Sequence, residues 1–188
     1  MATAEVLTPP ALDVVVPDGF EMLDGMLVEK RMGEKSCWIG GQLFGLIWTF
    51  VMAHPGVGRV YPQDTGFRCF PNRPRHIRKP DVAFVRAEHL SPDLAEGEPR
   101  TRPDLVAEVI SPHEMAEELD EKIADYQSVG VPLIWIIYPN ARTVRVIRAD
   151  GSSPPPLTDA DTLTGETILP GFSCRVADFL PPLPAAAP

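Results

Sequence analysis

Cysteine, positive charge and long apolar runs are all scarce in this chain of 188 residues. The three cysteines, Cys37, Cys69 and Cys174, are far apart and odd in number, so they form neither a zinc-binding spacing nor a disulfide framework. We expect them to be reduced and partly buried. No run approaches the about 18 to 20 apolar residues of a membrane helix, and no basic segment followed by an apolar one opens the chain. These absences predict a cytoplasmic protein without a membrane partner.

The shortage of positive charge argues against a protein whose main task is to coat nucleic acid, because such domains are usually basic. Lys and Arg number 17 against 26 Asp and Glu, a formal net charge of −9. An enzyme that holds nucleic acid through a local patch and a metal ion remains compatible with this balance.

One segment, residues 68–79, does concentrate basic residues, since it holds five Arg or Lys and no acid. A phosphate backbone would bind most easily there. The predicted nucleic-acid-binding residues are Arg73, Arg75, Arg78 and Lys79 of this segment, with Arg102 before a later strand. The alternative is a solvated basic loop or a subunit contact.

Apolar residues make up 44% of the chain and charged residues 23%, which is typical of a globular protein of one domain. Many of the 22 prolines lie near the ends. We therefore expect an extended N-terminal segment over 1–17, a folded domain over 18–180 and a Pro/Ala-rich tail over 181–188 that is loosely attached.

Apolar periodicity predicts a mixture of strands and helices. A hairpin over 20–30 has Asp24-Gly25 as its turn, and a helix with Ser36 as N-cap follows. A second helix begins after Ser111 and stops at Gly130. Strands are expected at 58–62, 65–70, 81–85, 104–110, 133–138 and 142–148, with short strands near the C-terminus. This order predicts an α/β domain with a mixed, twisted sheet flanked by helices.

Within the stretch RPDLVAEVISP, Glu108 interrupts an apolar strand. Alternation places it on one face with Val106 and Ile110, and a buried carboxylate needs a charged or metallic partner. In the following helix the only basic residue, Lys122, falls at the edge of the apolar stripe at about 100° per residue. Lys122 is therefore the expected partner, and a purely structural ion pair is the alternative.

Asp81 opens another strand, in KPDVAFV. Two carboxylates at a sheet edge can bind a hard divalent cation such as Mg²⁺, which polarises a phosphodiester and activates a water molecule. A lysine ammonium beside them can orient that water or offset charge on phosphorus.

The segments KPDVAFV, PDLVAEVISP, EKIADYQSVGVPLIWIIYP and RTVRVIRADG, in this order, resemble the PD-(D/E)XK nuclease superfamily. More closely, residues from about Phe20 to Leu180 resemble the stand-alone bacterial family described as putative restriction endonuclease. The resemblance implies a restriction-endonuclease-like core.

By this resemblance, Asp81 and Glu108 match the two metal-binding acids, and the backbone carbonyl of Val109 would be a further ligand. The superfamily's lysine two residues after the second acid is replaced by Ile110, and Lys122 matches the lysine that has moved to the next helix. Glu29 is a candidate extra acid at the metal, with an exposed strand-end glutamate as the alternative.

We therefore expect an endonuclease dependent on Mg²⁺ or Mn²⁺ that hydrolyses DNA and acts as a homodimer. One alternative is an inactive nuclease fold that binds nucleic acid or a protein partner. Another is a glycosidase-type carboxylate pair, for which the sequence offers no sugar-binding surface.

Overall fold

The computed structural model describes residues 5–6, 15–30, 33–91, 97–112 and 114–183. Most of the predicted N-terminal segment and of the Pro/Ala-rich tail lies outside the described residues, so these two boundaries stay predictions.

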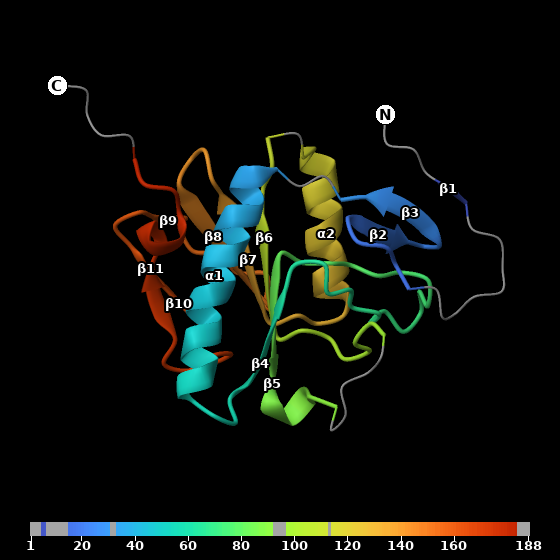
Figure 1. Cartoon of the computed structure of the whole chain (residues 1–188), viewed down its shortest axis with the longest axis horizontal. Coiled ribbons are helices and arrows are strands. Elements are labelled where there is room, and N and C mark those ends of the chain that lie inside the picture. Colours follow the sequence, from blue (N-terminus) through green and yellow to red (C-terminus); the bar gives the residue numbers. More distant parts are fainter. Residues whose placement is uncertain (1–4, 7–14, 31–32, 92–96, 113, 184–188) are drawn as a thin grey trace.

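A six-stranded mixed sheet forms the centre of the molecule, in the order β4-β5-β6-β7-β8-β9 (Figure 1). Only the β6–β7 pair in this sheet is parallel, and α2 (Ala116–Ser128) makes the crossover between these two strands. The strands are β4 (Gly58–Pro62), β5 (Val82–Arg86), β6 (Leu105–Val109), β7 (Leu133–Tyr138), β8 (Thr143–Arg148) and β9 (Leu157–Thr158). The predicted α/β class with a mixed sheet flanked by helices is confirmed.

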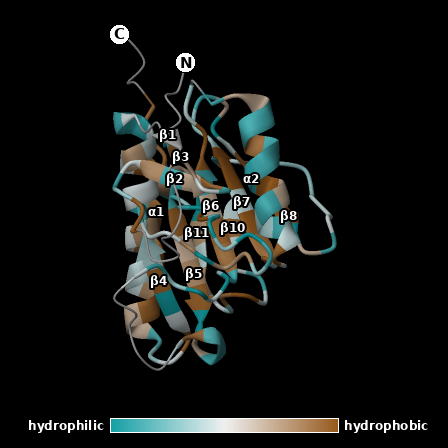
Figure 2. Ribbon diagram, turned by 90° about the vertical axis from the view of Figure 1, so that its right-hand side faces the viewer, coloured by the Kyte–Doolittle hydropathy of each residue, from teal (hydrophilic) through white to brown (hydrophobic). Residues whose placement is uncertain are grey.

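Two helices cover opposite faces of this sheet, α1 (Glu34–Ala53) and α2, as Figure 2 shows. On the α1 face, Ile39, Leu43 and Ile47 pack in one apolar cluster with Leu105, Ala107 and Val109 of β6. On the α2 face, Leu119, Ile123 and Tyr126 pack with Val106, Ile134 and Ile136. The alternation of β6 therefore directs Glu108, like Val106, toward α2.

The predicted hairpin is present as β2 (Phe20–Leu23) and β3 (Met26–Glu29), with β1 (Glu5–Val6) as a third strand. Asp24 and Gly25 have φ values of 52° and 90°, the left-handed backbone that a two-residue turn requires. Met22 and Ile77 exchange two backbone hydrogen bonds of 3.1 and 2.7 Å, which attach the hairpin to the segment before β5.

The chain ends in the predicted short strands, here β10 (Thr162–Thr164) and β11 (Ser173–Arg175), and a 3₁₀ helix, η2 (Val176–Phe179). Another 3₁₀ turn, η1 (Ala87–His89), follows β5. Cys37, Cys69 and Cys174 are free thiols that are partly or fully buried, as expected.

Three local predictions are wrong. Residues 65–70 form no strand and contribute only the isolated bridge between Phe67 and Arg78. The N-cap of α1 is Gly33, and the Ser36 hydroxyl accepts from the Gly33 N–H at 3.1 Å. Helix α2 begins at Ala116 rather than directly after Ser111, and the N–H of its N-cap residue Met115 donates to the Glu118 carboxylate at 3.2 Å.

By length and composition, α1 is apolar enough to cross a membrane, so the prediction that no such run exists is wrong on this criterion. The core helix of a globular protein can be equally long and apolar. Of the most apolar 18 residues of α1, 28% are buried inside the structure. Ile39, Leu43 and Ile47 are fully buried against the sheet.

Candidate active site

The two predicted metal-binding acids lie side by side on neighbouring strands. Val82 of β5 pairs with Ala107 of β6, so Asp81 lies directly across from Glu108. The Asp81 N–H donates to the Ala107 carbonyl at 3.1 Å, and the Val109 N–H donates to Asp81 Oδ2 at 2.7 Å. The acids are 3% and 1% exposed, so both carboxylates lie in a dry environment where partners are required.

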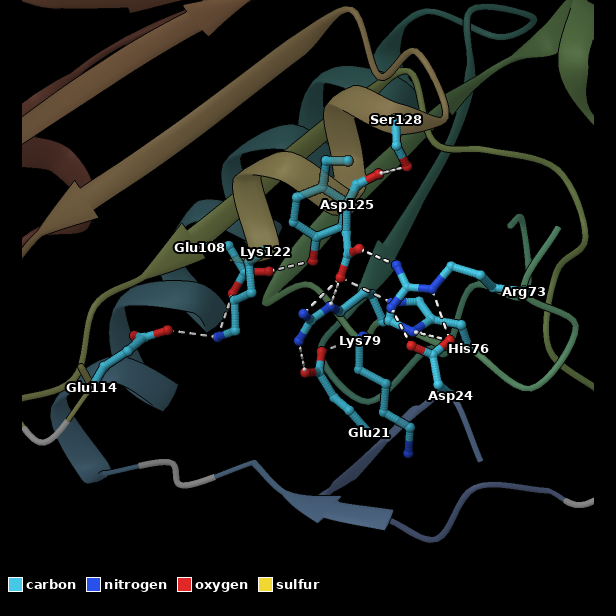
Figure 3. A network of polar contacts seen from close by, with 12 residues as sticks. Glu21, Asp24, Arg73, His76, Lys79, Glu108, Glu114, Lys122, Asp125 and Ser128 are labelled. Atoms are coloured by element: carbon cyan, nitrogen blue, oxygen red, sulfur yellow. Dashed lines mark hydrogen bonds and ion pairs between the residues drawn. The ribbon is translucent and has the colours of Figure 1, made fainter. Parts of the chain in front are cut away.

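Helix α2 supplies two partners for Glu108. The Tyr126 hydroxyl donates to Oε1 at 2.5 Å, and Lys122 Nζ lies 3.5 Å from Oε2 and 2.7 Å from Glu114 Oε1. Figure 3 shows the Lys122 ammonium between the two glutamates. The structure thus brings Lys122 to Glu108 as the helical face predicted. It also reveals Tyr126 as a second partner of Glu108, which the sequence did not predict.

The charges in this cluster depend on one another. Burial raises the pKa of Glu108 to about 7, an effect that Lys122 and Lys30 oppose and that Asp81 strengthens. Burial alone would lower the pKa of Lys122, but nearby carboxylates, Glu108 first, raise it above its usual value. A cation near Glu108 therefore favours the ionised carboxylate.

Sequence reasoning missed Lys30, which directly follows β3. Its Nζ lies 2.7 Å from Asp81 Oδ1 and 2.5 Å from the Lys79 carbonyl oxygen, and its side chain is 6% exposed. Burial alone would lower the pKa of Lys30, but the carboxylates of Asp81, Glu108 and Glu21 raise it.

The alternation of side chains along β3 was the sequence signal that could have indicated that Lys30 is buried. Continued past the end of β3, it directs Lys30 to the opposite side from Glu29, and the Lys30 N–H still bonds the Gly19 carbonyl at 2.7 Å. Glu29 is exposed, which fits the alternative of a strand-end glutamate better than that of a metal ligand.

Part of the predicted phosphate-binding segment is not on the surface. Arg78 and Lys79 are 4% and 2% exposed. Arg78 Nη1 donates to Glu21 Oε2 at 2.8 Å and its Nε to Asp125 Oδ2 at 2.7 Å, while Lys79 Nζ donates to the carbonyl of Pro17 at 2.9 Å. Both side chains bond buried groups of their own chain, which argues against the prediction that they contact phosphate.

Arg73 and His76 extend the same network (Figure 3). Arg73 donates twice to Asp24 at 2.7 Å and also reaches Asp125, and His76 Nε2 lies 2.9 Å from Asp125 Oδ2. These residues, together with Glu21 and Arg78, form a polar clasp between the β2–β3 hairpin and α2.

Two of the predicted phosphate-binding residues lie outside the clasp and keep exposed surface, and Arg73, within the clasp, is 37% exposed. Arg75 is exposed on the hairpin side of the clasp. Arg102 is partly exposed and lies 3.3 Å from Asp104 Oδ1.

The residues fit a divalent cation through their chemistry. Among the described residues, no three His, Cys, Asp or Glu side chains gather as a metal site. Two carboxylates, a backbone carbonyl and water are nevertheless a donor set that suits Mg²⁺, which retains several waters. The Lys30 ammonium lies 2.7 Å from Asp81 Oδ1, and the carboxylates of Asp81 and Glu108 favour positive charge at this position.

A cavity of about 310 Å³ lies elsewhere, between α1 and the C-terminal strands. Phe50, His54, Phe172 and Cys174 line it. It is on the α1 face of the sheet and does not include the acids.

Comparison with known proteins identifies the family. The model of the family described as putative restriction endonuclease (Uma2) matches residues 17–177. The chain belongs to this family. The matched residues include both acids, Lys122 and the hairpin.

A solved structure, that of a putative nuclease belonging to DUF820 from Anabaena variabilis ATCC 29413, has the same fold. Its TM-score is 0.73 at 19% sequence identity, over 91% of this chain and 97% of that one. No curated protein matches this chain. Membership of the Uma2 family and the nuclease-like fold support a nuclease.

Proposed function

We propose that this protein is a metal-dependent endonuclease that hydrolyses phosphodiester bonds in DNA. The observation that carries the proposal is the pairing of Asp81 and Glu108 on adjacent strands, with the Lys122 ammonium beside Glu108. A buried acid with a perturbed pKa and a specific charge partner, as Glu108 has, is typical of functional sites.

Each residue has a defined role in this proposal. Asp81, Glu108 and the Val109 carbonyl would hold Mg²⁺ or Mn²⁺, which when bound supplies Lewis acidity and an activated water. Lys122 offsets the negative charge that grows on the phosphoryl oxygens. The Tyr126 hydrogen bond keeps the Glu108 carboxylate in one orientation.

Arg75 and Arg102 are the remaining candidates for contacts with the nucleic-acid backbone. Both retain exposed surface in a protein whose net charge is otherwise negative. Their contacts would contribute affinity that weakens with salt rather than sequence specificity.

Replacing either acid tests the proposal directly. We expect Asp81→Asn and Glu108→Gln each to lower Mg²⁺-dependent nicking of plasmid DNA by about 100-fold or more, since each removes a metal ligand. Glu121→Gln, an exposed change next to Lys122, is the matched control and should leave nicking unchanged. Undiminished nicking by both acid variants, purified in folded form, would contradict the proposal.

A second function is favoured by one observation, which is that both carboxylates already have partners within the chain. Asp81 contacts Lys30, and Glu108 contacts Lys122 and Tyr126. An inactive nuclease fold that binds nucleic acid or protein would need no metal. Calorimetry without a Mn²⁺ signal, together with no nicking of plasmid, would favour this function over the first.

We further propose that the protein acts as a homodimer in the cytoplasm. Cutting both strands of a duplex takes two sites, and two-fold symmetry is the commonest way to provide them.

A further inference from the structure

Lys30 is the strongest unexplained feature near the candidate site. Its ammonium is 2.7 Å from Asp81 Oδ1, and Asp81 Oδ2 accepts the Val109 N–H at 2.7 Å. Both oxygens of the first acid are therefore engaged. A metal ion that binds Asp81 through Oδ1 would compete for this oxygen with the Lys30 ammonium, since two cations at one carboxylate oxygen repel each other.

The electrostatic surroundings make Lys30 a cation shared by several acids. The carboxylates of Asp81, Glu108 and Glu21 all stabilise the charged form of Lys30. Its second hydrogen bond is to the carbonyl oxygen of Lys79, which lies two residues before Asp81 in the chain.

Lysine is suited to an exchangeable role. Its ammonium is a compact charge on a flexible four-carbon side chain. Unlike the planar guanidinium of Arg, it does not form two parallel hydrogen bonds to one carboxylate. Lys30 comes from the end of a hairpin strand, outside the central sheet that carries the acids. Its ammonium can therefore move while the acids stay in register.

We propose that Lys30 is an internal counter-ion of the metal site, whose ammonium neutralises Asp81 and Glu108 until a divalent cation displaces it from Asp81. The inference rests on the proposed function in so far as the two acids bind metal. It adds that metal binding competes with a charge of the chain itself, so that affinity for the metal is lower than two buried carboxylates would otherwise provide.

The test removes the charge and retains the shape and polarity. Lys30→Gln can still donate to the Lys79 carbonyl but cannot compete electrostatically with a divalent cation. We expect Lys30→Gln to bind Mn²⁺ at least about tenfold more tightly than wild type by titration calorimetry, because a like charge near the ion is removed. Lys30→Arg, which keeps the charge, is the matched control and should not bind more tightly than wild type.

Thermal unfolding provides a second readout that does not depend on nuclease activity. Lys30→Gln should unfold at a lower temperature than wild type without metal, because two buried carboxylates lose a cation. Saturating Mn²⁺ should raise its unfolding temperature by more than it raises that of wild type.

The possible failures are distinct. Equal or weaker Mn²⁺ binding by folded Lys30→Gln overturns the counter-ion inference and leaves the proposed nuclease intact. Tighter binding without nicking of DNA by wild type supports the inference and overturns the nuclease. Absence of Mn²⁺ binding in wild type and in both variants overturns both.

Discussion

Glu108 is the residue on which the site depends, because it is 1% exposed and carries a charge that the interior disfavours. Tyr126 and Lys122 contact its two oxygens from the same face of α2, one helical turn apart. The helix therefore sets both the orientation and the ionisation of the carboxylate.

Removing the hydroxyl of Tyr126 measures how much its hydrogen bond to Glu108 stabilises the fold. We expect Tyr126→Phe to lower the free energy of unfolding by about 1 to 3 kcal/mol, since a buried carboxylate loses a donor. Tyr61→Phe is the control, because the Tyr61 hydroxyl accepts only a long 3.4 Å bond from Arg59 and should cost less. Urea unfolding in which the two variants lose equal stability would contradict the assigned role.

At the residue scale, the sequence predicts the acids and Lys122 but not Lys30. Glu108 and Lys122 are conspicuous because each conflicts with the apolar pattern around it. Lys30 follows a short hairpin strand, and nothing local shows that this strand end lies against Asp81. That contact depends on how the hairpin packs on residues 76–81, which is long-range information.

At the scale of elements, the polar clasp joins the β2–β3 hairpin to α2. Arg78 bonds Glu21 of β2 and Asp125 of α2, and His76 also bonds Asp125. Burial alone would raise the pKa of Asp125, but the hydrogen bond from His76 and the Arg78 guanidinium lower it well below its usual value.

A carboxyl whose folded-state pKa is lowered stabilises the fold above its unfolded-state pKa, here about 3.8, and loses this contribution as the pH falls through the folded value. Asp125→Asn should therefore cost about 2 to 3 kcal/mol at pH 7 and show a shallower loss of stability below about pH 4 than wild type. The measurement is urea unfolding across pH 2 to 7, with the exposed Asp120→Asn as control. Equal pH slopes for Asp125→Asn and wild type would refute the clasp.

The clasp also explains why sequence reasoning failed on residues 68–79. A run of basic residues is typical of a phosphate-binding loop, but the acids that neutralise this one are about 50 residues away in sequence, on the hairpin and on α2. Elements with strong periodicity, such as β6, β7 and α1, are predicted well because local pattern determines them. The strand expected at 65–70 forms no ladder in the structure.

At the scale of the whole molecule, α1 presents an apolar outer face. Trp38, Trp48 and Met52 are 43%, 46% and 60% exposed, and no charged residue occurs between Ser36 and Ala53. Trp38 precedes Gly41 by three residues, and Trp48 follows Gly45 by three. This symmetric spacing suits an antiparallel pairing with a second copy of α1, in which the two glycines face each other at the centre, where the backbones can approach closely, and the tryptophans pack on either side of them.

Oligomeric state tests this arrangement. We expect wild type to sediment as a dimer and Trp48→Glu to sediment as a monomer, because a charge buried within an apolar interface is strongly unfavourable. Met115→Glu, a charge at an exposed apolar residue just before α2, should leave the dimer intact. A monomeric wild type, or an unaffected Trp48→Glu dimer, would rule out this interface.

The central claim is that Asp81 and Glu108 form one divalent-cation site. Crystals soaked with Mn²⁺ test it most directly through the anomalous signal of the ion. The account predicts one peak at about 2 Å from a carboxylate oxygen of each acid, with the Lys30 ammonium moved away from Asp81. No peak there, with Lys30 still bound to Asp81 at saturating Mn²⁺, would contradict it.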